Sequence, residues 1–456
     1  MVIGGDAAGM SAASQARRRR GPDDLHILAF ERGSYTSYSA CGIPYWIGSV
    51  VGPRDRLIAR RPEVFRDRFA IDVRVRHVVE EIDLTARRVV VHDADRARRR
   101  TEAFDSLVVA TGSVPVRPPI PGIDAGGVYG VQTLGDGEAL RAELDSGRVR
   151  RVVVIGSGYV GLEIAEATHR RGFETTVVET AATPLATFDP DVGSLIADAI
   201  RDLGIELVLL EPVTAIDADA DGRVCRVRTA GRTLPADLVV LGLGVRPDVE
   251  LSRAAGIPLG TSGAIAVDRR MRTGAEDVWA AGDCVESIHR LTGARVLAPL
   301  GTHANKQGRV AGINIGGGYA TFPGVIGTAA TKVCNLEVAR TGVGEHEARA
   351  LGYECVTASA DSTTRAGYFP GSAPIRVKMI AERRSGLLLG AQIVGREGAA
   401  KRIDVCATAI WSAMTVEEVL GLDLSYAPPF SPVWDPVLVA ARRTDGAVRD
   451  DLRSSG

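Results

Sequence analysis

Residues 151–179 read RVVVIGSGYVGLEIAEATHRRGFETTVVE, and this stretch decides the fold. The apolar run 151–155 is typical of a buried parallel strand, and a glycine-rich turn, a helical pattern and a second strand at 175–178 follow it. The glycines of the turn are Gly156, Gly158 and Gly161. They let the backbone approach a pyrophosphate, while the helix N-terminus offers unpaired N–H groups and the positive end of a dipole. This order of elements predicts a dinucleotide-binding βαβ unit.

The second strand of this unit ends in Glu179, where a carboxylate can accept hydrogen bonds from an adenine-side ribose. The same carboxylate repels a 2′-phosphate, and no arginine follows it closely. We therefore expect NADH to be preferred to NADPH.

A weaker copy of the pattern opens the chain. An apolar start at 1–3 precedes Gly4-Gly5-Asp6-Ala7-Ala8-Gly9, and after a helical stretch the strand 26–30 is closed by Glu31. Asp6 occupies the middle glycine position, so its carboxylate must point away from a bound pyrophosphate. Only three residues precede Gly4, so the first strand is short or the natural start lies upstream.

Two further strand ends belong with the weaker motif. The strand 107–109 runs into Ala110-Thr111-Gly112, and the strand 278–281 runs into Gly282-Asp283. Together with the two glycine motifs, in this order, they resemble the two-dinucleotide flavoprotein fold. The resemblance implies that Asp283 approaches the ribityl chain of FAD and that the 110–112 turn lies where the FAD-binding and NAD-binding domains meet. The implied FAD residues are Gly4, Gly5, Ala8, Gly9, Glu31, Ala110, Thr111, Gly112, Gly282 and Asp283.

The predicted fold class is α/β, with two Rossmann-like dinucleotide-binding domains and a C-terminal α+β dimerisation domain. The FAD-binding domain is split into residues 1–118 and 244–322, the NADH-binding domain is inserted at 119–243, and the dimerisation domain covers 323–456. The last domain shows strands near 375–380 and 387–394, then helices near 399–413 and 416–420. The tail 442–456 is polar, and we expect it to be loose.

Cys41 stands alone in Ser37-Tyr38-Ser39-Ala40-Cys41-Gly42-Ile43-Pro44-Tyr45. Two-cysteine flavin disulfide reductases carry a second cysteine five positions later, where this chain has Trp46. A lone cysteine cannot close an internal disulfide, so its oxidised form is a mixed disulfide with a small thiol or a sulfenic acid. We interpret the five other cysteines as small buried apolar residues: Cys225, Cys284, Cys334, Cys355 and Cys406.

Across nearly its whole length the chain resembles the pyridine nucleotide-disulfide oxidoreductases, and among them the single-cysteine coenzyme A-disulfide reductases. The closer match rests on 37–45 and on Tyr426-Ala427-Pro428-Pro429-Phe430-Ser431-Pro432. The resemblance implies a homodimer whose C-terminal domain sends tyrosines into the partner's active site. The matching catalytic tyrosines are Tyr426 and Tyr368.

The same resemblance implies roles around the two ligands. Tyr159 would move aside for NADH, and Glu163 would help to seat the nicotinamide. The positions that match coenzyme A contacts of the family are Ser11, Gln15, Arg18 and Ser37, while Ala40 replaces an asparagine and Phe69 a lysine of some relatives. Pro44 suits the first turn of a helix, whose dipole we expect to help lower the pKa of the Cys41 thiol.

Three other functions remain open. An NADH oxidase or peroxidase would cycle Cys41 through sulfenic acid, but relatives of that type carry a histidine where this chain has Ala7. A polysulfide or persulfide reductase shares every catalytic residue. From a different class, a flavin-binding electron-transfer protein or redox sensor would react once without turnover.

Composition limits which binding partners and which cellular compartment we expect for this protein. With 456 residues and a formal charge of −1, the chain has no bulk attraction for nucleic acid or an anionic membrane. Its apolar runs are of strand length, and its six cysteines show neither a CxxC pair nor metal-ligand spacing. We expect a cytoplasmic enzyme with a small-molecule disulfide substrate and no metal.

Overall fold

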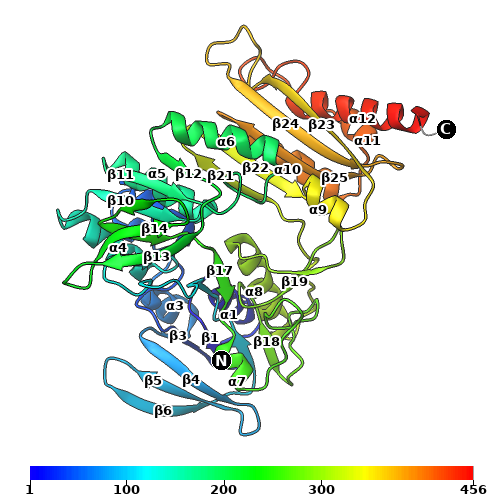
Figure 1. The fold of residues 1–456 in the computed structure, drawn as a ribbon. Helices are drawn as coiled ribbons and strands as arrows, with labels where there is room; N and C mark the ends of the chain where they lie inside the picture. The colour runs from blue at the N-terminus through cyan, green and yellow to red at the C-terminus, as the bar shows by residue number, and fades with distance from the viewer. Residues whose placement is uncertain (455–456) are drawn as a thin grey trace.

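The first strand of the chain lies in the middle of a parallel sheet. In the computed structural model, which describes residues 1–454, this sheet has the order β18-β7-β1-β2-β3. Its strands are β1 (Val2–Ile3), β2 (Ile27–Phe30), β3 (Ile71–Arg74), β7 (Leu107–Val109) and β18 (Val278–Ala280). Segments from both ends of the split domain thus share one sheet, and β1 is as short as the sequence indicated (Figure 1).

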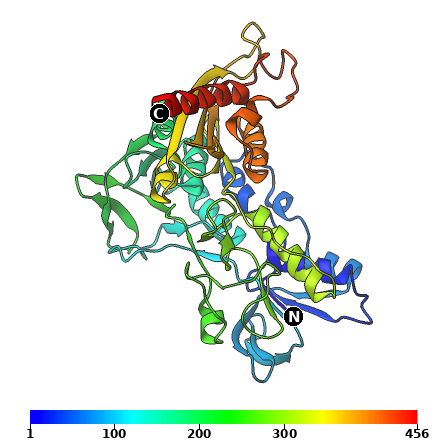
Figure 2. The same cartoon turned by 90° about the vertical axis from the view of Figure 1, so that its right-hand side faces the viewer.

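The helices α1 (Ala7–Arg17) and α8 (Gly301–Ile315) lie side by side against this sheet, although about 300 residues separate them in sequence (Figures 1 and 2). Two glycines of α8 allow the close approach. A Cβ at Gly308 would lie 2.1 Å from the Ala8 carbonyl oxygen, and one at Gly312 would lie 2.2 Å from that of Ala12. Their backbones are therefore in direct contact, and both N-termini face the same side.

The second sheet is also parallel and has the order β12-β11-β10-β16-β9. Its strands are β9 (Val128–Gly130), β10 (Arg151–Ile155), β11 (Glu174–Val178), β12 (Glu206–Val208) and β16 (Leu238–Leu241), with the helices α4 (Leu134–Asp145), α5 (Tyr159–Arg170) and α6 (Pro190–Asp202). All five strands come from within 119–243. The predicted strand–turn–helix–strand unit at 151–178 is present as β10, α5 and β11.

Smaller elements connect and flank these sheets. The strands are β4 (His77–Asp83), β5 (Arg88–Asp93), β6 (Arg98–Ala103), β8 (Ser113–Pro115), β13 (Val213–Ala218), β14 (Val224–Thr229), β15 (Thr233–Pro235), β17 (Val245–Pro247), β19 (Ser287–Ile288) and β20 (Arg295–Val296). The helices are η1 (Ala40–Gly42), α2 (Ile43–Ile47), η2 (Arg54–Leu57), α3 (Pro62–Phe69) and α7 (Glu250–Ala254). The antiparallel pair β8–β17 joins the two chain crossings between the nucleotide-binding units.

The C-terminal part is an antiparallel sheet of order β21-β22-β25-β24-β23 with helices packed on it. Its elements are β21 (Ala329–Val333), β22 (Leu336–Gly342), α9 (Glu345–Ala350), β23 (Cys355–Thr363), β24 (Pro374–Glu382), β25 (Leu388–Gly395), α10 (Ala399–Trp411), α11 (Val416–Leu420) and α12 (Pro436–Ser454). The strands and helices expected between 375 and 420 are all present.

The prediction of a loose tail at 442–456 was wrong for the described residues, because α12 runs through to Ser454. Thr444 is fully buried, and Val448 is nearly so and belongs to the C-terminal hydrophobic core. Arg449 pairs with Glu417 of α11 over 2.9 Å. A few apolar side chains on one face thus hold a mostly polar helix in place. Residues 455–456 of the predicted tail lie outside the described residues.

A buried ion cluster joins the second sheet to the C-terminal sheet. The Lys378 side chain on β24 is 7% exposed, and its ammonium group lies 3.0 Å from Asp189, 2.8 Å from Asp191 and 3.3 Å from Glu345. Burial alone would lower the pKa of Lys378, but hydrogen bonds to Asp191 and Asp189 outweigh it and raise the pKa above its usual value. Since Asp189 immediately precedes α6, the cluster fixes that helix on the C-terminal sheet.

Candidate active site

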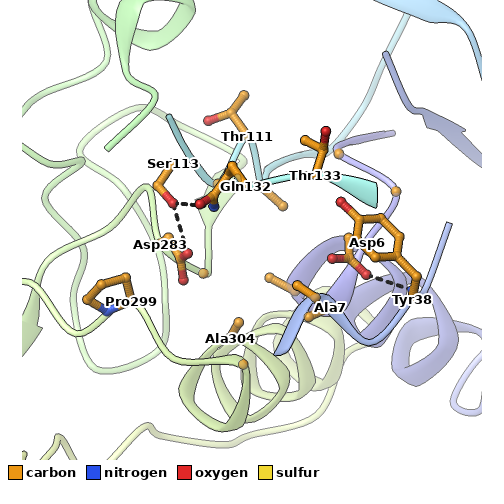
Figure 3. Close-up of a pocket in the computed structure, with 18 of the residues that line it drawn as sticks. Asp6, Ala7, Tyr38, Thr111, Ser113, Gln132, Thr133, Asp283, Pro299 and Ala304 are labelled. Carbon is orange, nitrogen blue, oxygen red and sulfur yellow. Dashed lines mark hydrogen bonds between the residues drawn. The ribbon is translucent and has the colours of Figure 1, made fainter. Parts of the chain in front are cut away.

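One cavity of about 1720 Å³ receives residues from both glycine motifs, from both strand ends of the split domain and from the segment around Cys41. Figure 3 shows part of its wall, with Asp6 and Tyr38 on one side and Asp283 on the other. The predicted residues that line it are Gly4, Gly5, Ala8, Ser11, Gln15, Arg18, Glu31, Ser37, Cys41, Ala110, Thr111, Gly112, Gly158, Tyr159, Glu163, Gly282 and Asp283. Distant segments thus meet in one place.

Four predicted nucleotide-binding residues do not line the cavity: Gly9, Gly156, Gly161 and Glu179. Gly9, Gly156 and Gly161 instead allow close backbone packing: a Cβ at Gly9 would lie 1.9 Å from the Gly4 carbonyl oxygen. Gly156 also has a φ of +98°, which favours glycine. Their part is to shape the turns at the strand ends.

The residues of the first motif fit a dinucleotide such as FAD. A Cβ at Gly4 would lie 2.1 Å from the Ala110 carbonyl oxygen, so only glycine leaves this turn tight. Glu31 accepts hydrogen bonds from the Gly5 and Gly33 N–H groups over 2.7 and 2.6 Å, which fixes its carboxylate beside the turn. The N-termini of α1 and α8 both reach the cavity wall, and their positive dipole ends suit an anionic group.

Two polar residues that the sequence did not single out hold Asp283. The Ser113 hydroxyl donates to Asp283 over 3.0 Å, and the Gln132 side-chain amide donates to Ser113 over 2.9 Å (Figure 3). Burial raises the pKa of Asp283, and the hydrogen bond from Ser113 opposes this. Gln307 on α8 accepts from the Gly282 N–H over 2.8 Å, so the Gly-Asp turn is fixed from two sides.

The Asp6 carboxylate turns toward Tyr38, whose backbone N–H donates to it over 3.2 Å (Figure 3). Burial raises the pKa of Asp6 to about 7, and the negative charge of Glu31 adds to the rise. The middle position of the motif thus carries a carboxyl group that is close to half-protonated at neutral pH.

On the NADH side, Glu179 is held at the end of β11. Its carboxylate accepts from the Ser157 N–H and hydroxyl over 2.8 and 2.7 Å, and from the Ala181 N–H over 3.0 Å. Burial alone would raise the pKa of Glu179, but these donors outweigh it and lower the pKa. The carboxylate is therefore charged at neutral pH, as discrimination against a 2′-phosphate requires.

Cys41 lies in η1, one turn before Pro44, which stands in the first turn of α2. Two effects within the chain oppose the expected lowering by the helix dipole: burial raises the pKa of Cys41, and the negative charge of Glu163 raises it further.

Glu163 faces the same cavity from α5 and accepts a hydrogen bond from the Thr331 hydroxyl over 2.9 Å. Burial raises the pKa of Glu163 to about 7, so it can both hold and release a proton near neutral pH. Thr331 belongs to β21 of the C-terminal sheet, a contact that the sequence gave no means to foresee.

The positions matched to coenzyme A contacts all line the cavity. Ser11 donates to Asn305 of α8 over 2.7 Å, and Arg18 donates to Gln15 over 3.2 Å. Ser37 adopts the left-handed conformation with φ of 47°, and its carbonyl oxygen accepts from the Ala59 N–H over 2.8 Å.

The two predicted catalytic tyrosines do not line this cavity within one chain. Tyr368 lies in the loop between β23 and β24, which projects from the top of the molecule in Figures 1 and 2, and Tyr426 lies between α11 and α12. They are 78% and 46% exposed, and their hydroxyl groups interact with each other. Further exposed apolar residues follow Tyr426 in the segment before α12: Phe430, Val433 and Trp434.

Of the other cysteines, Cys284, Cys334 and Cys406 are buried as expected, whereas Cys225 and Cys355 are half-buried. Within residues 1–454, Cys41 is the one cysteine that reaches the cavity. The same residues form no group of three or more metal-ligating side chains and no helix long and apolar enough to cross a bilayer.

Comparison with known proteins gives two domain matches that cover most of the chain. Residues 1–308 match the family described as pyridine nucleotide-disulphide oxidoreductase, and residues 328–436 match the dimerisation domain of that family. A curated relative from Pyrococcus abyssi, named NAD(P)H sulfur oxidoreductase (CoA-dependent), is 39% identical over 97% of each chain.

Two further proteins extend the comparison. A coenzyme A disulfide reductase from Staphylococcus epidermidis is 27% identical over 94% of this chain and 96% of its own. The solved structure of an NAD-dependent persulfide reductase from A. fulgidus superposes with a TM-score of 0.95 at 40% identity, covering 99% of this chain and 83% of that one.

Proposed function

This chain belongs to the pyridine nucleotide-disulphide oxidoreductase family, and we propose that it is an FAD-dependent NADH oxidoreductase that cleaves the sulfur–sulfur bond of a coenzyme A-borne substrate through Cys41. The comparisons confirm the predicted family and the predicted fold class. They also confirm an oxidoreductase that acts on sulfur and uses FAD and a nicotinamide cofactor. The dimerisation domain indicates a homo-oligomer.

The observation that carries the proposal is the position of Cys41. It lines the same cavity as Asp283 of the FAD-type motif and Glu163 of the NADH-type helix, and no second described cysteine reaches this cavity. If a cysteine without an internal partner takes part in disulfide exchange, the second sulfur atom must come from the substrate.

The Cys41 thiolate attacks one sulfur of coenzyme A disulfide, forms a mixed disulfide and releases a coenzyme A thiolate, which takes up a proton. Two electrons that originate on NADH then cleave the mixed disulfide, which regenerates the thiolate and releases the second coenzyme A. The sum is one disulfide, one NADH and one proton converted into two thiols and NAD⁺.

Bound FAD would supply the two-electron relay between NADH and sulfur. The residues proposed to hold it are Gly4, Gly5, Glu31 and Asp283, for the geometric reasons given above. We propose that Glu163, whose pKa is about 7, seats the nicotinamide and also tunes the charge beside Cys41.

We propose that the active site is completed by a second subunit. Tyr368 and Tyr426 are exposed, adjacent to each other and absent from the cavity of their own chain, which fits tyrosines that enter the partner's site. A neutral phenol there can orient the substrate sulfur and donate a proton to the leaving thiolate.

Coenzyme A persulfide is the second candidate substrate, because two relatives near 40% identity are named for sulfur or persulfide reduction. Here NADH, a proton and one persulfide would give coenzyme A, hydrogen sulfide and NAD⁺. Attack by Cys41 on the inner sulfur gives the same mixed disulfide, so one site serves both reactions.

An anaerobic steady-state screen tests the proposal. It compares coenzyme A disulfide, coenzyme A persulfide, glutathione disulfide and polysulfide, with oxygen and peroxide assayed separately. We expect a coenzyme A-borne substrate to have the highest kcat/KM, and Cys41→Ser to abolish its reduction while the flavin is still reduced by NADH.

Mass spectrometry of the oxidised protein provides the independent measurement. We expect a coenzyme A adduct on the Cys41 peptide that a reductant releases. A sulfenic acid on that peptide, with peroxide turned over faster than any sulfur substrate, would instead support the oxidase or peroxidase. A single spectral change without continued NADH consumption would support the redox sensor.

A further inference from the structure

The helix that follows Cys41 packs on the inserted nucleotide-binding unit. By sequence, α2 lies in the first part of the predicted FAD-binding domain, but its buried side chains share one hydrophobic core with helix α4 of the inserted unit: Ile43, Trp46 and Ile47. A Cβ at Gly137 of α4 would lie 2.6 Å from the Ile43 side chain, so the two helices are in close contact. The support for the Cys41 segment therefore comes from a part of the chain about 100 residues later.

Two arginines hold the last turn of α2. The Arg141 guanidinium on α4 lies 4.8 Å from the centroid of the Trp46 ring and donates to the Trp46 carbonyl oxygen over 2.5 Å. Arg171, the C-cap of α5, donates to the Ile47 carbonyl oxygen over 3.5 Å. Asp145 at the end of α4 forms ion pairs with both arginines, which places the two guanidinium groups together at the end of α2.

The same face of α4 holds the chain on either side of α2. Glu138 accepts hydrogen bonds from the Tyr35 hydroxyl over 2.8 Å and from the Arg54 guanidinium over 2.5 Å. Spacings of three and four residues put Glu138, Arg141 and Asp145 on one side of the helix. One charged face of α4 thus contacts the segment 35–54 before, within and after α2.

Cys41 consequently lies between an anchor on each nucleotide-binding unit. On the side of the first glycine motif, the Ser37 N–H donates to the Gly5 carbonyl oxygen over 3.1 Å. On the other side, the contacts of Trp46 with Arg141 fix the end of α2. The position of the Cys41 sulfur therefore depends on both units.

We propose that Arg141 and Glu138 are positioning residues, which hold the Cys41 segment on the NADH-binding domain and thereby set the place of the Cys41 sulfur for exchange with the substrate. The inference rests on the proposed function of Cys41. Trp46, at the position where two-cysteine reductases carry their second cysteine, supplies the ring for this anchor. Neither Arg141 nor Glu138 lines the cavity, so both act through the placement of α2 and not by touching the substrate.

Rapid mixing separates the two half-reactions of the FAD-loaded enzyme. A misplacement of about 1 Å can slow a reaction by about a hundredfold, so a loosened α2 should slow flavin reoxidation by coenzyme A disulfide. We expect Arg141→Gln to slow this step about tenfold, to leave flavin reduction by NADH unchanged and to lower kcat with KM nearly constant. Arg141→Lys should restore most of the rate, because lysine keeps a cation over the ring and a donor for the carbonyl oxygen.

Arg290→Gln is the matched control. Arg290 lies 3.9 Å from the centroid of the Trp411 ring and donates to the Trp411 carbonyl oxygen over 3.4 Å, so it repeats both contacts at the end of α10, and neither residue lines the cavity. It should leave both half-reactions unchanged. If Arg141→Gln does not retain flavin, Glu138→Ala serves the same test, with an expected slowing of flavin reoxidation of about threefold.

Hydrogen exchange gives a readout without turnover. The N–H groups of Gly48 and Ser49 donate to the carbonyl oxygens of Pro44 and Trp46. We expect Arg141→Gln, but not Arg290→Gln, to speed the exchange of these two amides by about tenfold.

Unchanged half-reactions in Arg141→Gln, equal slowing of both half-reactions, or the same loss in Arg290→Gln would overturn the positioning role and leave the proposed function intact. If the wild type reduces no coenzyme A-borne substrate, the proposed function fails, and the exchange of the Gly48 and Ser49 amides decides whether Arg141 anchors α2.

Discussion

Replacing Lys378 by methionine tests the buried ion cluster between α6 and the C-terminal sheet. Removing one partner of a buried pair costs about 3–5 kcal/mol, because the remaining charge stays buried without compensation. Asp191 and Glu345 are 44% and 30% exposed and can regain water, so the cost comes mainly from Asp189, which is 6% exposed. We therefore expect the lower end, about 3 kcal/mol.

Calorimetric melting of the FAD-loaded protein at one scan rate measures this effect. A loss of about 3 kcal/mol corresponds to a fall in Tm of roughly 6–12 °C for a cooperative unit of 150–250 residues. Adding Asp189→Asn to Lys378→Met should recover part of the loss, since it removes the uncompensated charge. Lys401→Met is the matched control, because Lys401 is 88% exposed and its contact with Asp404 contributes little.

The pH dependence follows from the raised pKa of Lys378. A raised pKa means that the stabilisation is fully present below the unfolded value of 10.5 and is lost as pH rises through the folded value. The difference in Tm between wild type and Lys378→Met should thus be constant across neutral pH. A Tm change of less than about 2 °C, or a further fall on adding Asp189→Asn, would refute the reasoning.

Three predictions concern the cavity. Glu179→Arg should shift the ratio of kcat/KM toward NADPH by about tenfold or more, the effect of ~1.4 kcal/mol, and an unchanged ratio would place the ribose elsewhere. Asp283→Ala should release flavin on gel filtration, because it removes an acceptor that Ser113 holds in place; a full flavin content would count against this role. Glu163→Gln removes a negative charge that raises the pKa of Cys41, so the pH midpoint for alkylation of Cys41 by iodoacetamide should move down, and a midpoint that stays or rises contradicts the assignment.

The parts of the fold that sequence predicts well are those whose signal is local. The strand, turn and helix at 151–170 follow directly from residue spacing, and the C-terminal strands appear within one or two residues of their predicted bounds. The helix α12 was missed because its composition is polar, and its burial depends on a narrow face around Thr444 that packs on strands about 80 residues earlier.

The same distinction applies to the candidate site. Cys41 and the glycine motifs carry recognisable spacing, whereas Gln132 has no motif and reaches Asp283 only through Ser113. The raised pKa of Cys41 was not predicted either, because it comes first from burial and then from the charge of Glu163, about 120 residues away. Contacts of this kind depend on the tertiary fold, not on neighbours in sequence.

The backbone contact between α1 and α8 has a consequence for the order in which the chain folds. Gly308 and Gly312 pack directly on the carbonyl groups of Ala8 and Ala12, so α1 cannot complete its packing before residue 312 has been synthesised. The strands of the inserted sheet all lie within 119–243, so this sheet can form before residue 312 has been synthesised. During synthesis we therefore expect the inserted unit to close first and the N-terminal segment to remain an open, protease-sensitive partner until the second half of the chain emerges.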